Sequence, residues 1–120
     1  MAYLRFHSQD ISPYTGERYG IFVAVWHLIR DERVTDEEAA EYWSHREWFE
    51  ANLPIPPFYA EGNPDKAVTW FKRNALTQEM KTRLGFYHTL AAKYGVGIAE
   101  QSAESLANII YEDAYQVAVV

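Results

Sequence analysis

The stretch "NIIYEDAYQVAVV" (108–120) holds two short apolar runs separated by polar residues at Glu112 and Asp113. Side chains two residues apart share one face of a strand. Both runs place their larger side chains on such positions: Ile109 and Tyr111 in the first, and Tyr115, Val117 and Val119 in the second. The pattern predicts a β-hairpin. Its turn lacks the glycine that tight hairpins prefer, so the turn geometry stays open.

A hairpin by itself is only marginally stable in water, so this chain needs further strands. The N-terminal "YLRFHS" (3–8) alternates, with Leu4 and Phe6 on one face, and reads as a half-buried strand. Another strand is predicted at 96–100. We expect the N-terminal strand to pair with the C-terminal strands.

Two helices are expected in the first half of the chain. "GIFVAVWHLIRD" (20–31) contains many β-forming residues, but its less apolar positions recur every three to four residues, which favours a mostly buried helix. "TDEE" (35–38) forms a capping box in which Thr35 and Glu38 bond each other's backbone, and it starts a helix over 36 to about 51. Its expected buried stripe is Ala39, Tyr42, Trp43, Arg46, Phe49 and Leu53, with Trp48 beside the stripe and partly exposed.

The segment "GNPDKAVTWFKRNA" (62–75) begins like a third helix. Asn63 is a favourable N-cap, and Pro64 suits the first helical position because its missing N–H costs nothing there. The sequence predicts a helix over 64–94, with a break near Thr77 left open.

The predicted order is one strand, three helices and two or three strands. This order favours a single α+β domain over 1–120, with a small antiparallel sheet packed on one side by about three helices. Gly95 stands where glycine commonly ends a helix. Prolines at 54, 56 and 57 predict an extended loop before the third helix.

Composition excludes several classes of protein. The absence of cysteine excludes disulfides, thiolate metal sites and a cysteine nucleophile, and it fits a reducing compartment. No apolar run approaches the roughly 20 residues that span a bilayer. The net charge of −6 argues against non-specific nucleic-acid binding. We therefore expect a soluble, cytoplasmic protein.

Charge is distributed unevenly along the chain. Residues 31–50 hold eight acids against two arginines, and residues 65–93 hold six basic residues against two acids. One interpretation is a pair of helices with oppositely charged faces that can face each other. The other is an acidic surface that meets a basic partner.

The sequence contains no recognisable catalytic or metal motif. Glu41 with His45, and His27 with Asp31, are four residues apart and could each offer two metal ligands, but two ligands do not make a site. No phosphate-binding glycine loop and no nucleophile elbow occur. We expect no metal and no cofactor. Candidates for acid/base chemistry are His7, Glu17, His27, Glu112 and Asp113.

The high aromatic content, with four Trp, nine Tyr and six Phe, is the other feature that can indicate a function. They either fill the core or leave some members as binding anchors. The binding residues that we predict are Glu37, Glu38, Glu41, Trp48, Tyr59, Trp70, Lys72 and Tyr115.

Taken together, the segments "GIFVAVWHLIRD", "AVTWFK" and "IIYEDAYQVAV" resemble a group of small, uncharacterised soluble bacterial proteins. The resemblance covers about residues 3 to 119. It implies a bacterial source and a compact single domain, and it transfers no activity and no catalytic residue.

Three functions remain open. The preferred hypothesis is a small acidic binding protein, for example an inhibitor or immunity-type protein whose helix 36–51 meets a basic partner. The alternative is a cofactor-independent enzyme or ligand-binding protein with a cleft between sheet and helices, lined by His7, Glu17, Trp70, Lys72 and Tyr111. The third is a homodimer closed by exposed aromatic residues.

Overall fold

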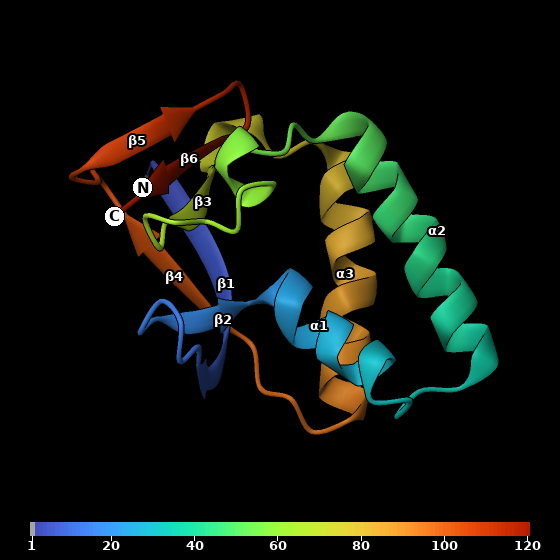
Figure 1. The fold of residues 1–120 in the computed structure, drawn as a ribbon. Helices are drawn as coiled ribbons and strands as arrows, with labels where there is room; N and C mark the ends of the chain where they lie inside the picture. The colour runs from blue at the N-terminus through green and yellow to red at the C-terminus, as the bar shows by residue number, and fades with distance from the viewer. Residues whose placement is uncertain (1) are drawn as a thin grey trace.

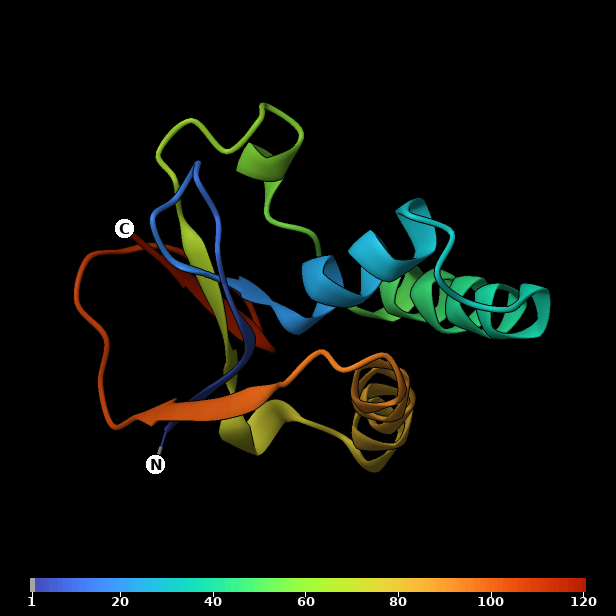
Figure 2. The same ribbon diagram turned by 90° about the horizontal axis from the view of Figure 1, so that it is seen from below.

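The structure is a computed structural model that describes residues 2–120, and it has two layers (Figures 1 and 2). Within these residues, an antiparallel sheet of six strands forms one layer, and three helices cover one of its sides. The helices are α1 (Ile21–Arg30), α2 (Asp36–Asn52) and α3 (Gln78–Lys93). The strands are β1 (Tyr3–Ile11), β2 (Arg18–Gly20), β3 (Val68–Lys72), β4 (Ala99–Ala103), β5 (Ile109–Glu112) and β6 (Gln116–Val119). The predicted α+β class and one-sided packing are confirmed.

Strand β1 organises the sheet, whose order is β2-β1-β3-β6-β5 with β4 also paired to β1. Strand β4 covers one edge of β1 along Tyr3–His7. The opposite edge is shared, because β3 pairs only with Tyr3 and Leu4, and β2 pairs from His7 onward. Strands β2 and β3 therefore diverge around Arg5 and Phe6, where the edge of β1 is left open.

The predicted hairpin is β5 and β6, and Asp113 closes its turn without glycine. Asp113 Oδ1 accepts hydrogen bonds from the backbone N–H groups of Tyr115, at 2.7 Å, and Gln116, at 2.9 Å. These hydrogen bonds from the Asp113 side chain hold the turn closed, so a glycine is not needed there. The N-terminal strand pairs with β4 as expected, but it reaches the hairpin only through β3. Strand β4 begins at Ala99, three residues later than predicted.

The helix predicted over 64–94 is wrong in its first part. Residues 68–72 form β3, and α3 begins at Gln78 with Thr77 as its N-cap. Asn63 does not cap a helix. It has φ 52°, and its side chain closes a loop by accepting from Ala67 N at 2.9 Å and donating to Ala67 O at 3.0 Å. The β-forming run Val68–Lys72 then finds hydrogen-bond partners on both sides, in β1 and β6, which override the local helix signal.

Other helix predictions agree with the structure. Helix α1 is formed, and the capping box of α2 is complete, with Thr35 and Glu38 bonded to each other's backbone at 2.9 and 3.1 Å. Gly95, with φ 75°, ends α3. One position of the predicted buried stripe of α2 is wrong: Trp43 is 45% exposed, and the Arg46 guanidinium lies 5.1 Å from its ring centre.

The core lies between the two layers, around Tyr87 of α3. Three aromatic rings from the other two helices pack near it: Phe22 of α1 at 5.2 Å, and Tyr42 and Phe49 of α2, both at 5.9 Å between ring centres. Phe71 of β3 contributes to the same cluster. Much of the aromatic content thus belongs to the core, with edge-to-face geometries that aromatic pairs prefer.

Candidate functional site: a cleft at the fork of the sheet

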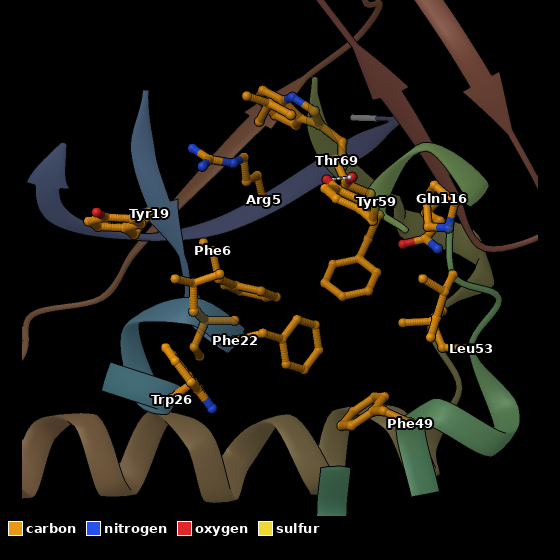
Figure 3. A pocket seen from close by; sticks show the side chains of 18 of the residues that line it. Arg5, Phe6, Tyr19, Phe22, Trp26, Phe49, Leu53, Tyr59, Thr69 and Gln116 are labelled. Carbon is orange, nitrogen blue, oxygen red and sulfur yellow. Dashed lines mark hydrogen bonds between the residues drawn. The ribbon is translucent and has the colours of Figure 1, made fainter. Parts of the chain in front are cut away.

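A cavity of about 640 Å³ opens where β2 and β3 diverge. It runs between the sheet, the first two helices and the proline-rich loop that joins α2 to β3 (Figure 3). Its lining includes side chains from β1, β3, α1 and α2, and most of the lining surface is apolar. The cleft is therefore a product of the tertiary fold and not of one local motif.

The end of the cleft near the helices is aromatic. Trp26 extends from α1 and Phe49 from α2 toward the space below β1, and Phe6 approaches it from the strand (Figure 3). Phe22 packs edge-to-face on Phe49 with ring centres 5.1 Å apart. Leu53, at the end of α2, adds an aliphatic wall. These side chains form a preformed apolar surface.

The middle of the cleft carries a few polar groups. The Tyr59 hydroxyl and Thr69 Oγ1 are 2.6 Å apart and share a hydrogen bond. Tyr59 is 39% exposed, but burial around its hydroxyl raises its pKa. On the far wall, Gln116 Nε2 donates to the carbonyl of Pro54 and so ties the proline-rich loop to the sheet. The loop is thereby fixed as one side of the cleft.

Arginine side chains dominate the charge of the cleft. Arg5, Arg18 and Arg46 line it, together with one carboxylate, Glu50. Glu50 is neutralised by Arg46, with Oε1 2.9 Å from Nε. Arg5 lies on β1, on the side of the strand opposite Phe6, and Arg18 lies on β2, one of the two strands that diverge. A chain with net charge −6 thus carries a positive pocket.

The structure brings only two of the eight predicted binding residues into the cleft, Tyr59 and Trp70. Trp70 is 8% exposed, so it serves as a wall of the cleft and not as a surface anchor. Lys72 instead forms an ion pair with Glu112 at 2.5 Å. Tyr115 is half-buried and packs against the core.

The other four predicted residues lie on α2. Glu37 and Glu41 are exposed. Glu38 is engaged within the chain, since it accepts from Lys93 Nζ at 2.7 Å and from the Tyr94 hydroxyl. These bonds, led by the one from Lys93, lower the pKa of Glu38 to about 2. Part of the acidic helix therefore does face the basic one.

Trp48, the last of the four, faces α3. Its half-buried ring lies under the Arg83 guanidinium, 4.7 Å away. A cationic side chain over an aromatic face is attracted to it. The Trp48 ring therefore helps to pack α2 against α3.

The residues of the alternative hypothesis are divided among separate places. His7 and Glu17 line a second, smaller cavity of about 280 Å³ that also touches Arg5. His7 is buried, and its Nδ1 donates to the Ser8 carbonyl at 2.9 Å. Tyr111 bonds Asp113 at 2.8 Å, outside both cavities.

The histidine pairs considered as metal ligands do not gather a third ligand. Within residues 2–120, no group of three or more His, Asp or Glu side chains is arranged to hold a metal ion. Burial lowers the pKa of His27 and of His45, in both cases aided by a nearby arginine. His45 stacks on Phe86, with ring centres 4.6 Å apart.

Arg5 and the aromatic set of α1 and α2 are the site residues that sequence reasoning missed. The alternation of residues 3–8 placed Arg5 on the face opposite Leu4 and Phe6, where a charged side chain is expected in solvent, so the sequence carried no signal that Arg5 would be buried. The divergence of β2 and β3 beside it had no signature in the sequence.

Comparison with known proteins finds no matching family, no similar curated protein and no similar solved structure. Among the described residues, no helix is both long enough and apolar enough to cross a membrane. The resemblance to uncharacterised bacterial proteins stays a prediction.

Proposed function

We propose that this protein binds a small, largely apolar molecule in the cleft at the fork of the sheet. The observation that carries the proposal is the cavity of about 640 Å³, lined mainly by aromatic and aliphatic side chains and open to solvent. Ligand sites in proteins occupy roughly 300–1,000 Å³, are mostly apolar and contain a few fixed polar groups. The Tyr59–Thr69 pair supplies such polar groups.

The four tryptophans allow a test without mutating the cleft. Trp26 and Trp70 line the cavity, and Trp43 and Trp48 do not. We expect the neutral probe 2-naphthamide to shift the indole N–H signals of Trp26 and Trp70 in nitrogen–proton correlation spectra. The signals of Trp43 and Trp48 serve as the internal control and should stay in place. Saturable shifts confined to the control pair, or no saturable shift at all, would refute the proposal.

A second proposal keeps the partner-binding function expected from the sequence. It is supported by exposed residues of α2, namely the Trp43 ring and the carboxylates of Glu37 and Glu41. An exposed tryptophan is the type of anchor that a protein partner can use, and exposed carboxylates favour a basic partner. An inhibitor role at a cytoplasmic location remains the specific form of this proposal.

Charge reversal tests this second proposal. Glu37→Lys and Glu41→Lys together should weaken capture of a basic partner from the native cell with little change in the urea midpoint. Glu38→Lys is a poor choice for the same purpose, because Glu38 also holds Lys93 and the capping box. Unchanged capture of every specific partner by the double variant would contradict the proposal. A homodimer is the third possibility, and sedimentation at high micromolar concentration decides it.

A further inference from the structure

Arg5 is the most unusually placed charge in the protein. It is the third residue of β1, at the open edge between β2 and β3, and only 8% of its surface is exposed. Within residues 2–120, its side chain forms one hydrogen bond, from Nη2 to the carbonyl of Arg18. Among the described residues, no carboxylate lies within ion-pair distance of Arg5. The guanidinium is therefore a nearly buried cation without an anionic partner.

Such a placement is costly unless something compensates it. Taking a cation out of water is unfavourable, and a buried charge is therefore normally paired. Burial lowers the pKa of Arg5, while Glu17 and Tyr59 act in the opposite direction. An arginine stays charged at neutral pH even so. The remaining donors are not sealed in protein, because the only fully buried side-chain polar atom without a partner in residues 2–120 is Ser8 Oγ. They face the cavity space that Arg5 lines.

The position of Arg5 relative to the aromatic cluster gives the cleft two chemically different ends. Arg5 and Phe6 extend to opposite sides of β1, so the cation and the aromatic wall are separated by the strand itself (Figure 3). The open edge of β1 joins the two sides, and the Tyr59–Thr69 pair lies beside Arg5, above the aromatic cluster in this view. A ligand that fills the cleft can thus place an apolar body beside the helices and a polar head beside Arg5.

We propose that the ligand is an amphipathic carboxylate, whose anionic head pairs with Arg5 while its apolar body lies among the aromatic side chains of α1 and α2. This inference rests on the proposed function of the cleft. A carboxylate matches the planar guanidinium, which offers parallel N–H donors to its two oxygens. The only carboxylate of the cleft lining, Glu50, is already paired with Arg46, so it neither neutralises Arg5 nor repels the head strongly.

Two probes of the same shape separate this inference from the proposed function. 2-Naphthoate carries the carboxylate, and 2-naphthamide replaces it by a neutral amide. We expect naphthoate to bind the wild-type protein roughly ten-fold more tightly in calorimetric titration, as one charge-assisted pair in a partly open site provides. We also expect naphthoate, and not naphthamide, to shift the Nε–H signal of Arg5.

Two arginine variants provide the matched comparison. Arg5→Met and Arg18→Met each remove one positive charge from the cleft lining, so they change the net charge of the protein equally. Only Arg5→Met should abolish the preference for naphthoate, leaving the binding of naphthamide within about two-fold of wild type. Arg18→Met should keep most of the preference.

A third variant does not alter the proposed contact and covers the case in which Arg5→Met fails to fold. Glu17 is the carboxylate whose charge acts most strongly on Arg5, without forming an ion pair with it. Glu17→Gln should tighten the binding of naphthoate about two- to three-fold and leave naphthamide unchanged, because a nearby carboxylate repels an anionic head.

The outcomes are distinguishable. If naphthamide binds and naphthoate binds no better, or if the two methionine variants lose the preference equally, the carboxylate inference is overturned and the cleft remains a binding site. If neither probe binds, the proposed function itself fails.

Discussion

Replacing glycine by alanine should change the stability of the protein in opposite directions at two positions of α3 and its C-terminus. Gly85 lies in the middle of α3, and Gly95 follows its C-terminus with φ 75°. Apart from the adjacent backbone, a Cβ built at either position meets no atom within 4 Å. Contacts with the rest of the fold therefore contribute nothing at either site, and only the backbone conformation distinguishes the two substitutions.

The magnitudes follow from that difference. Gly85→Ala removes glycine from a helix interior and should stabilise the protein by about 0.8–1 kcal/mol. Gly95→Ala forces an L-residue into the left-handed region, which costs roughly 1–2 kcal/mol. The smaller entropy of the unfolded alanine chain returns about 0.4–1 kcal/mol of this. The net expectation for Gly95→Ala is a loss of about 1 kcal/mol.

Urea unfolding followed by circular dichroism measures both effects. For a slope of about 1–2 kcal/mol per molar urea, a change of 1 kcal/mol moves the midpoint by about 0.5–1 M. The midpoint of Gly85→Ala should rise and that of Gly95→Ala should fall. Midpoint shifts of the same sign in the two variants would contradict this account, because Gly85 lies in a helical conformation and Gly95 in the left-handed conformation that ends the helix.

Two further substitutions test the loop and the acidic helix. Asn63→Ala should lower the free energy of unfolding by about 2–3 kcal/mol, because it removes two hydrogen bonds to the buried Ala67 and leaves alanine at positive φ; a loss below 0.5 kcal/mol in urea unfolding would contradict this account. Glu38→Gln tests the pH dependence. The pKa of Glu38 is lowered from 4.5 to about 2 by Lys93 and the other donors, so its charge stabilises the fold above pH 4.5 and this contribution is lost as the pH falls toward 2. The urea midpoint of the wild-type protein should exceed that of Glu38→Gln at pH 7, and the gap should close between pH 4.5 and 2; a gap that stays constant over this range would show that the Glu38 carboxylate does not titrate with folding.

The sequence by itself determined the elements whose causes are local. The capping box of Thr35 and Glu38 starts α2 because its two hydrogen bonds join residues only three positions apart. Gly95 ends α3 because glycine enters the left-handed region at no steric cost. The alternation in residues 108–120 predicted the hairpin, and the apolar periodicity predicted α1. The α+β class followed from their order along the chain.

Only the tertiary structure decided β3 and the cleft. The helix signal of Asn63 and Pro64 is local, but Val68–Lys72 lies between β1 and β6, and backbone hydrogen bonds to both partners outweigh that signal. Likewise, no sequence pattern near Arg5 predicts that β2 and β3 diverge beside it. The divergence arises because β3 pairs with only the first two residues of β1 and β2 pairs from His7 onward. The cleft, its aromatic end and its unpaired guanidinium all follow from that long-range register, which no local pattern encodes.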